Sequence, residues 1–346
     1  MRPSKVGIIG AGKFGVSIAK LVSKNADVVL HTRNQTTLQT VNKENRIGNI
    51  ELEKNIDAIS DLQQLASECT LIMPMVPSAA FRDMMKDISP FLGPEHIMIH
   101  GTKGLDILGQ SKQLDFPGGF QVGDVRTMSQ VILEESSVIR VGCLSGPNIS
   151  SEILAGQPTA TVVASEFNEV INLGKEILES KQFFVFGSNS IIGAELAGAL
   201  KNYIALGAGI LEGHGMGRNL QALLITRGLR EMIHISKLYK VDVDSFLGTA
   251  GIGDLFATAT SKDSRNFQAG LKIAKGFTLE EITSDSKFTA EGVRTLAIAN
   301  QLSKHMEATA PITRLLYSVV FKNFNFEKAI QSIMRYPFTK DVDFLD

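Results

Sequence analysis

A short apolar run followed by three spaced glycines constrains the fold of this chain more than any other stretch. Residues 5–10 read KVGIIG, typical of a buried parallel strand, and residues 10–15 read GAGKFG. Gly10 permits a tight turn, Gly12 lets the backbone approach a pyrophosphate, and Gly15 lets the next helix pack closely on the strand. The pattern predicts the first strand, turn and helix of a dinucleotide-binding domain, with a purely structural glycine turn as the alternative.

The end of the second predicted strand bears on the choice between NAD and NADP. A helix is predicted from Lys13 to about Ser23, with its first N–H groups facing the phosphates, and a strand from Asp27 to His31. An acidic residue after this strand would bind the ribose 2′-OH, whereas a basic one accommodates a 2′-phosphate. The chain has His31 and Arg33 there and no acid. The sequence favours NADP over NAD, unless Arg33 is an ordinary solvated arginine.

Alternating helices and strands continue along the first half of the chain, as a doubly wound sheet requires. Helices are predicted over 59–67, 79–88 and 128–135, and strands over 70–76, 97–100, 137–144, 159–164 and 183–186. From about Gly187 to Asn323 there is almost no strand pattern. We therefore predict an α/β Rossmann-type doubly wound sheet over residues 1–187, followed by an all-helical domain over residues 188–346.

Several polar segments follow predicted strands. Ligands of an open parallel sheet lie at the carboxyl ends of its strands, which places Lys103 of the GTKG segment beside cofactor and substrate, although a solvated loop lysine fits equally. In SGPNISSE, residues 145–152, Asn148 and Ser150 either cap a helix or face a ligand at its N-terminus. Residues 106–127, which are polar and glycine-containing, are expected to form a surface loop or lid.

One lysine lies in the middle of an apolar stretch. Residues 193–213, GAELAGALKNYIALGAGILEG, read as a helix that protein surrounds on most sides, and its glycines suggest close approach of another backbone or a ligand. Burial lowers the pKa of a lysine, so Lys201 is a candidate proton donor or acceptor near neutral pH. Glu195 lies on another face and cannot be its local partner. The charges disfavour a membrane span, while a core helix whose lysine reaches the surface remains the alternative.

A second polar segment follows in the helical half. Residues 251–270 contain Arg265 between two neutral hydrogen-bonding side chains, Ser264 and Asn266. Because a guanidinium binds phosphate in bidentate fashion, this cluster predicts an anion site, although such a loop is more often a helix cap. Glu291, in FTAEGVRT, is either a charge at a helix N-terminus or a hydrogen-bond acceptor for the cofactor.

Charge and cysteine content limit the possible partners. The formal net charge of −1 gives no field to recruit nucleic acid or an anionic membrane. Cys69 and Cys143 each lie in an apolar run and are expected to be buried reduced thiols. The N-terminal sequence has no signal-peptide pattern, so we expect a cytoplasmic protein.

Taken in order, these motifs resemble the NAD(P)-dependent glycerol-3-phosphate dehydrogenases. The resemblance is carried by GAGKFG, TKG, SGPNISSE, ELAGALKN, ITRGLREM, AGIGDL, SRN and EGVRT, spread from residue 5 to about 320. It implies a soluble enzyme that interconverts dihydroxyacetone phosphate and sn-glycerol 3-phosphate with NADP or NAD. In bacteria this reaction supplies the phospholipid backbone. By resemblance alone we expect a homodimer.

The resemblance also assigns residues. Lys201 falls on the catalytic proton donor and acceptor, and Asp254 on the residue that assists at the substrate hydroxyls. The expected substrate contacts are Lys103, Gly146, Asn148, Asn202, Asp254, Thr258, Ser264, Arg265 and Asn266. The expected cofactor contacts are Gly10, Gly12, Lys13, Phe14, Gly15, Arg33, Lys103, Ser150, Arg265, Thr289 and Glu291. No metal site is expected.

Three features depart from the family pattern. The connection over 106–127 is longer than usual, Phe14 replaces a commoner tryptophan or tyrosine, and Thr289 replaces a commoner valine. Two alternatives to the dehydrogenase stay open. One is a related enzyme acting on a hydroxy acid or phosphogluconate, which leaves the Ser264 to Asn266 cluster unexplained. The other is a nucleotide-binding redox sensor without turnover, which Lys201 and Asp254 argue against.

Overall fold

The computed structural model describes residues 3–284, 291–307, 309–337 and 340–342. Contacts divide the chain into two compact units. The first comprises residues 1–106 and 126–191, and the second comprises residues 107–125 and 192–346. The change of unit near residue 191 lies close to the predicted boundary at 187, but residues 107–125 group with the second unit, whereas the prediction placed them in the first.

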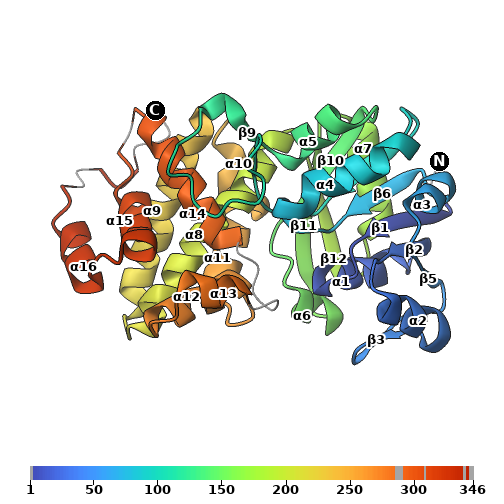
Figure 1. Ribbon diagram of the computed structural model, residues 1–346, viewed down its shortest axis with the longest axis horizontal. Coiled ribbons are helices and arrows are strands. Elements are labelled where there is room, and N and C mark those ends of the chain that lie inside the picture. The colour runs from blue at the N-terminus through green and yellow to red at the C-terminus, as the bar shows by residue number, and fades with distance from the viewer. Residues whose placement is uncertain (1–2, 285–290, 308, 338–339, 343–346) are drawn as a thin grey trace. The chain divides into compact units, whose positions relative to one another are not determined.

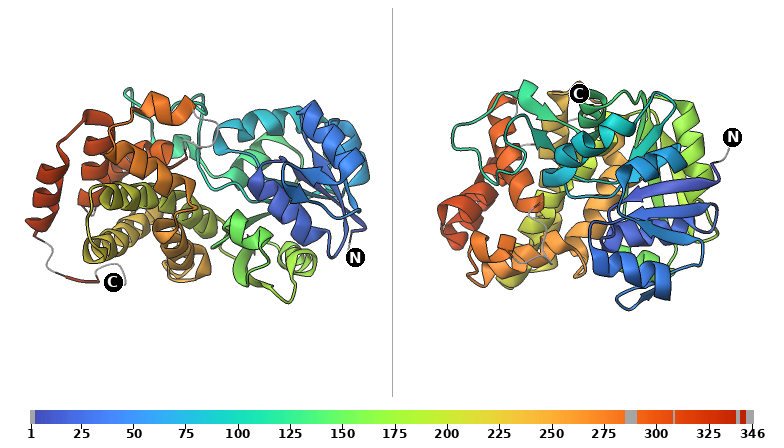
Figure 2. Two further views of the ribbon diagram at one scale, coloured as in Figure 1. Left: turned by 90° about the horizontal axis from the view of Figure 1, so that it is seen from below. Right: turned by 45° about the vertical axis from the view of Figure 1, so that its right-hand side comes forward.

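The first unit is built on one eight-stranded sheet (Figure 1), in the order β12-β11-β10-β7-β6-β1-β2-β5. Its strands are β1 (Lys5–Ile9), β2 (Asp27–His31), β5 (Ile56–Ile59), β6 (Leu71–Pro74), β7 (Ile97–His100), β10 (Arg140–Ser145), β11 (Thr159–Ser165) and β12 (Phe183–Ser188). All neighbours are parallel except β10 and β11, which are antiparallel. The blue N-terminal strands lie next to one another in the right-hand view of Figure 2. The predicted parallel sheet therefore has one reversal, directly after the SGPN segment.

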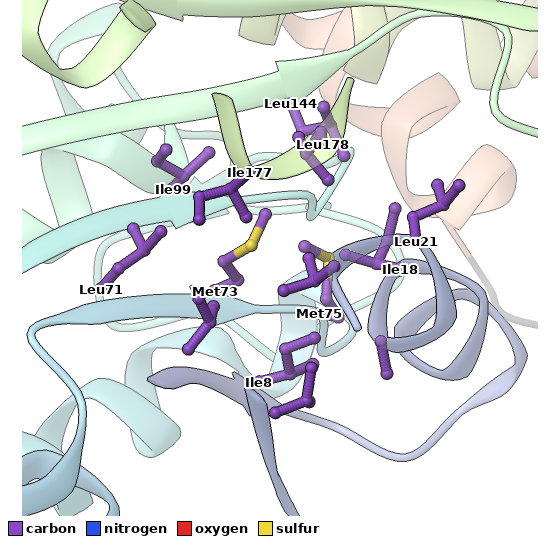
Figure 3. Close-up of a cluster of buried hydrophobic side chains, with 14 of the residues drawn as sticks. Ile8, Ile18, Leu21, Leu71, Met73, Met75, Ile99, Leu144, Ile177 and Leu178 are labelled. Carbon is purple, nitrogen blue, oxygen red and sulfur yellow. The ribbon is translucent and has the colours of Figure 1, made fainter. Parts of the chain in front are cut away.

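Helices cover both faces of this sheet, as a doubly wound fold requires. They are α1 (Lys13–Val22), α2 (Gln35–Glu44), α3 (Leu62–Glu68), α4 (Ser78–Ile88), α5 (Met128–Glu135), α6 (Ser150–Leu154) and α7 (Asn168–Leu178). Figure 3 shows the core under α1 and α7, where Ile18 and Ile177 meet side chains of four strands, among them Ile8, Met73 and Ile99. Burying such side chains contributes about 1.5–3 kcal/mol each. This packing fixes the strand ends where the polar segments begin.

The sequence prediction missed several elements of the first unit. Helices α2 and α7, strand β5 and the short strands β3 (Arg46–Ile47) and β4 (Ile50–Glu51) were not predicted, and the helix predicted over 59–67 begins later than expected. Asp61 ends the strand and starts α3, because its carboxylate accepts the N–H of Gln63 at 2.8 Å. Ile56 and Ala58 are buried on alternate positions, a strand pattern too short to stand out in the sequence.

The second unit is helical. Its helices are α8 (Ile191–Gly213), α9 (Arg218–Lys237), α10 (Asp244–Leu247), α11 (Asp254–Thr260), α12 (Arg265–Ala274), α13 (Leu279–Ser284), α14 (Glu291–Leu302), α15 (Pro311–Lys322) and α16 (Phe326–Met334). Within the described residues after β12 there is no strand, as predicted. A Cβ added to Gly209 of α8 would overlap the carbonyl oxygen of Phe267 on α12. The expected close approach of another backbone to a glycine of this helix is confirmed. None of the described helices is long and apolar enough to cross a membrane.

The segment 107–125 packs on the helices of the second unit and does not stand free as an open loop. The short strands β8 (Asp106–Ile107) and β9 (Val125–Arg126) pair at its two ends. Inside it, Phe116 and Phe120 are both buried and meet edge to face at 5.1 Å. The Tyr317 hydroxyl of α15 donates to Asp115 at 3.0 Å. Most residues of 107–125 are exposed or half-buried, in keeping with the expected surface loop, but this part of the loop is packed on α15 and is not open.

An ion-pair network holds the residues that flank this segment. Arg82 of α4 donates to Asp106 at 2.7 Å and to Glu134 at 2.8 Å, and it also bonds Glu135. Arg126 pairs with the same Glu134. The residue before the segment and the residue after it are therefore tied to one arginine-centred cluster of the first unit.

Candidate functional site

The turn after β1 has the geometry of a pyrophosphate cradle. Gly10 adopts φ +116°, and a Cβ there would lie 2.8 Å from the carbonyl oxygen of Met75. A Cβ on Gly15 would overlap the carbonyl oxygen of Gly10, so only glycine fits both positions. Around a Cβ on Gly12, by contrast, no described atom lies within 4 Å. This open space adjoins the start of α1, which has no side-chain cap, so its N–H groups can take a phosphate.

Three further predicted cofactor residues lie near this turn. Lys13 is exposed on the first turn of α1, and Phe14 packs so closely that a Cβ on Gly101 would lie 2.8 Å from its ring. Arg33 is exposed just after β2. Burial lowers the pKa of His31, opposed in part by its contact with the carbonyl oxygen of Ser60. Because His31 is therefore neutral near pH 7, Arg33 is the cation that follows this strand.

The ends of β7 and β10 bring two predicted residues together. Lys103 Nζ donates to the carbonyl oxygen of Gly146 at 2.6 Å. Gly146 has φ +137°, and a Cβ there would lie 3.1 Å from the backbone of Thr161. The two strands are neighbours in the sheet, which explains why residues far apart in sequence meet here. A lysine held by a backbone carbonyl is oriented but keeps its charge for an anionic ligand.

Asn148 offers an unused acceptor at the same sheet edge. Its Nδ2 donates to Thr161 Oγ1 at 2.8 Å, and Thr161 Oγ1 donates to the carbonyl oxygen of Ser145 at 3.0 Å. Asn148 Oδ1 is buried and accepts no hydrogen bond from the described residues. Helix α6, which begins at Ser150, has no side-chain cap, so Asn148 does not play the capping role that the sequence left open. A buried acceptor of this kind fits a hydroxyl of a ligand.

The lysine of α8 is buried and has two side-chain partners. Lys201 Nζ lies 2.5 Å from Asp254 Oδ1 and 2.5 Å from Thr258 Oγ1. Lys201 is 4% exposed and Asp254 is 1% exposed, so the lysine does not reach the surface as the alternative required. Asp254 and Thr258 lie one turn apart on α11 and therefore face the same way. The cost of desolvating a buried ion pair offsets the attraction between its charges, so such a pair adds little to stability. The presence of the Lys201–Asp254 pair in the interior therefore points to a chemical role.

A glycine-containing backbone turn presents Asp254 to the lysine. Residues Thr249–Gly253 form a wide π-helical turn that leads straight into α11. A Cβ on Gly251 in this turn would overlap the backbone of Phe246. Such turns occur often at functional sites, because they redirect a helix by a fraction of a turn. The glycines of the GIGDL motif thus place the carboxylate of Asp254.

Asn202, which follows Lys201 on α8, forms a hydrogen-bonded pair with Asn266 of α12. Asn266 Nδ2 donates to Asn202 Oδ1 at 2.8 Å, and Asn266 Oδ1 accepts the N–H of Gly292 at 3.0 Å. Ser264 accepts the N–H of Phe267 and so caps α12, which is the structural role that the sequence left open for this segment. The pair joins the middle of α8 to the first turns of α12 and α14.

Arg265 and Glu291 begin two helices of the same unit. Arg265 is the first residue of α12 and is exposed, and Glu291 is the first residue of α14. Although part of the side chain is exposed, the protein around the guanidinium displaces water from it and so lowers the pKa of Arg265, and the negative charge of Glu291 opposes this effect. The two charges therefore interact, and Arg265 keeps an exposed face for an anion. Thr289, the remaining predicted cofactor contact, lies outside the described residues.

Two buried polar residues that make several hydrogen bonds, Thr161 and Glu231, were not singled out from the sequence. Thr161 holds Asn148, but a threonine in a strand gives no signal in the sequence. Glu231 of α9 is fully buried and accepts the N–H groups of Ile312 and Thr313, both at 2.8 Å, at the start of α15. Burial raises the pKa of Glu231 to about 7. Glu231 could have been identified from the sequence as an acidic residue on the apolar face of the helix α9.

Comparisons with known proteins match the N-terminal and the C-terminal parts of the chain separately. Residues 5–171 match the family model of the NAD-dependent glycerol-3-phosphate dehydrogenase N-terminus, and residues 190–331 match that of its C-terminus. The glycerol-3-phosphate dehydrogenase [NAD(P)+] of Acinetobacter baumannii (strain SDF) is 34% identical, with 99% of this chain and 92% of that protein covered. The one of Carboxydothermus hydrogenoformans is 32% identical, with 98% and 99% covered.

A solved structure is similar over the same length. The crystal structure of glycerol-3-phosphate dehydrogenase from Coxiella burnetii has a TM-score of 0.84 and 26% sequence identity, and it covers 96% of this chain and 99% of that one. Both halves of the chain and nearly its full length are thus matched. The chain belongs to the NAD-dependent glycerol-3-phosphate dehydrogenase family.

Proposed function

We propose that the chain interconverts dihydroxyacetone phosphate and sn-glycerol 3-phosphate with NADP(H) or NAD(H), and that Lys201 gives and takes the proton. The observation that carries the proposal is the buried Lys201, bonded to Asp254 and Thr258 in a family of NAD(P)-dependent dehydrogenases. The family match disfavours the hydroxy-acid or phosphogluconate enzyme and the redox sensor as alternatives.

The reaction needs a proton at the carbonyl oxygen of the substrate. The nicotinamide, when bound, supplies the hydride. Lys201 Nζ carries the proton for the substrate oxygen, and its positive charge stabilises the alkoxide as this develops. Asp254 fixes Nζ and balances its charge, and Thr258 completes the contacts on one side of Nζ. The reverse reaction uses the same groups, with the proton returning to Lys201.

The phosphate of the substrate offers a handle away from the reacting carbon. Arg265 has the exposed guanidinium that suits a phosphate, and Lys103 carries a second cation. Asn148 Oδ1 is a free acceptor for a substrate hydroxyl. Binding energy from such remote contacts can be used to orient the reacting carbon.

The cofactor has a matching set of groups in the first unit. The open space at Gly12 and the uncapped start of α1 suit the pyrophosphate, and Arg33 suits a 2′-phosphate. We therefore propose that NADP is preferred over NAD. Ser150, Thr289 and Glu291 are proposed as further cofactor contacts by resemblance.

The decisive experiment follows the loss of reduced-nicotinamide absorbance when the purified protein meets dihydroxyacetone phosphate, with NADPH and NADH in parallel. We expect rapid loss for the native chain and a fall in kcat of at least about 10³-fold for Lys201→Ala, because proton transfer and charge stabilisation are both removed. NADPH binding should persist in this variant. Lys237→Ala, at the end of α9, is the matched control with unchanged kcat.

Two outcomes would contradict the proposal. A normal kcat in Lys201→Ala would exclude the role of this lysine. If the chain binds NADPH but consumes neither cofactor with this substrate, the redox sensor or another substrate moves ahead. A companion variant, Arg265→Ala, should mainly raise the KM for dihydroxyacetone phosphate; if KM stays the same, Arg265 does not hold the phosphate.

We also propose a cytoplasmic homodimer whose product supplies the glycerophospholipid backbone. The support is the membership of the family. Light scattering on the purified full chain would give twice the mass of 37.5 kDa if the dimer forms. A mass of one chain at micromolar concentration would contradict it.

A further inference from the structure

A cavity of about 450 Å³ lies in the second unit, between the segment 107–125 and the helices α14 and α15. Figure 1 shows the segment passing over α14. Residues 115–117 form one wall, and the facing sides of the two helices form the others. A volume of this size is within the range of about 300–1,000 Å³ that small-molecule sites show. None of the residues assigned above to substrate or cofactor lines it. The cavity is therefore a separate site.

The helix faces that line the cavity follow the helical repeat. Gln301 comes from α14 and Lys304 from the short helical turn Ser303–His305 just after it, whereas Arg314, Ser318 and Lys322 come from α15 at steps of four residues. Steps of three or four residues place side chains on one face of a helix. Each helix thus presents a continuous polar stripe to the cavity.

The third wall is held by several bonds. Arg294 of α14 donates to the carbonyl oxygen of Gln113 at 3.0 Å, and its guanidinium lies 5.7 Å from the ring centre of Phe116. Tyr317 donates to both carboxylate oxygens of Asp115, at 3.0 and 3.2 Å. The long connection that sets this sequence apart is thus folded into the wall of a polar cavity.

The charges in the cavity favour an anion. Three cations line it, Lys304, Arg314 and Lys322, against one acid, Asp115. The carboxylate of Asp115 already accepts the Tyr317 hydroxyl. Within the described ranges, none of the three cations forms an ion pair with a carboxylate: Lys304 donates to Gln301 at 2.5 Å, and Lys322 lies 5.6 Å from the Tyr317 ring centre. No carboxylate in the described part of the chain therefore pairs with these three charges.

We propose that this cavity binds the phosphate ester of a small polyol. Arg314 and Lys322 would hold the phosphate, with Lys304 as a third cation, because guanidinium and ammonium groups are the usual partners of phosphate. The neutral side chains Asn300, Gln301 and Ser318 on the same walls suit the hydroxyl groups. The proposal goes beyond the reaction at Lys201 and does not depend on it.

The test is calorimetric titration of the full chain with ribose 5-phosphate, with ribose as the uncharged control. Because the candidate active site also takes phosphate, every protein in the test carries Arg265→Ala. The pocket variant adds Arg314→Ser and Lys322→Ser. The charge-matched control instead adds Lys328→Ser on α16 and Arg335→Ser directly after it, two exposed positions outside the cavity.

We expect one equivalent of ribose 5-phosphate to bind the Arg265→Ala parent and the α16 control alike, and ribose not to bind. The pocket variant should bind at least about tenfold more weakly, because two of its three cations are lost. Replacing Arg314 by Lys, which keeps the charge, should restore part of the affinity. Turnover does not enter this readout, so its result is independent of the assay at Lys201.

Three results would overturn the proposal. Equal affinity in the pocket variant and the α16 control would place the ligand elsewhere. No binding to the Arg265→Ala parent, with binding to the native chain, would assign the ligand to the candidate active site alone. A smaller molecular mass of the pocket variant together with unchanged binding would identify this face as a contact between two copies of the chain.

Discussion

The two units prepare their functional groups in opposite ways. In the first, Gly12, Lys13 and Arg33 are exposed, and what the fold provides is backbone geometry and open space. In the second, Lys201 and Asp254 are buried and already bonded to each other. The first arrangement is suited to a ligand that arrives and leaves, because its groups are satisfied by water when the ligand is away. The second is preorganised, so little reorganisation is needed when the reaction occurs.

The largest test of this contrast removes the charge of one partner in the buried pair. Asp254→Asn should lower kcat by about 10²- to 10³-fold, because Lys201 loses the carboxylate that orients it. The affinity for NADPH, measured by fluorescence titration, should change by less than about twofold if the contrast between the units holds. Asp242→Asn, an exposed aspartate of the same unit, is the control. A normal kcat would show that the pair is structural only.

The next test compares two glycines of the pyrophosphate turn. Gly15→Ala should weaken NADPH binding by about 100-fold and lower the melting temperature, because its Cβ would overlap the carbonyl oxygen of Gly10. Gly12→Ala should also weaken binding but leave the melting temperature unchanged, since its Cβ enters open space. Equal NADPH affinity in native and Gly12→Ala proteins would mean that the open space does not hold the cofactor.

The same contrast explains which features could be predicted from the sequence alone. The turn at Gly10 to Gly15 could be predicted because it is local, and α1, β2 and β7 were found close to their observed ends. Lys201 could be singled out by its position in an apolar helix. Its partners could only be named by resemblance, because Asp254 and Thr258 meet it through tertiary packing. The Thr161 contact with Asn148 depends on the reversal at β11, which no sequence pattern indicated.

The packing of residues 107–125 escaped prediction for a similar reason. Polar and glycine-containing sequence is typical of a loop, and the pattern does not show which surface it will cover. The contacts that fix it come from Arg294 and Tyr317, far away in the chain.

A third test measures how the burial of a carboxylate away from the candidate active site affects the stability of the fold. Burial raises the pKa of Glu231 to about 7, so between its ordinary value of 4.5 and about 7 the folded state binds more protons than the unfolded state. The free energy of unfolding should therefore fall as pH rises through this window, by at most about 1.4 kcal/mol per pH unit. Below the window and above it, this contribution is constant.

Chemical denaturation of native and Glu231→Gln proteins at pH 5 and pH 7.5 checks this. The stability of the native chain relative to the variant should decrease at the higher pH, by up to about 3 kcal/mol. Glu327→Gln, an exposed acid on α16, should show no such difference. If the native chain instead gains stability relative to Glu231→Gln, the N–H groups of Ile312 and Thr313 that donate to this carboxylate outweigh its burial.

The smallest expected effect concerns the exposed cation after β2. Arg33→Ser should raise the KM for NADPH by about fivefold, since one solvent-screened phosphate contact contributes about 1 kcal/mol. The KM for NADH should stay within about twofold, because NADH carries no 2′-phosphate. Steady-state kinetics with both cofactors decide it. An equal rise for both would mean that Arg33 shapes the turn and does not read the 2′-phosphate.

The route of residues 107–125 also sets an order of events during synthesis. This segment leaves the ribosome well before α14 and α15, which carry the Arg294 and Tyr317 that it contacts. The first unit is likewise incomplete at that moment, because β10, β11 and β12 follow the segment in the chain. Since domains fold as units while the chain emerges, Phe116 and Phe120 stay exposed until α15 has been made. A nascent chain that stops before residue 322 would therefore present these aromatic rings to chaperones.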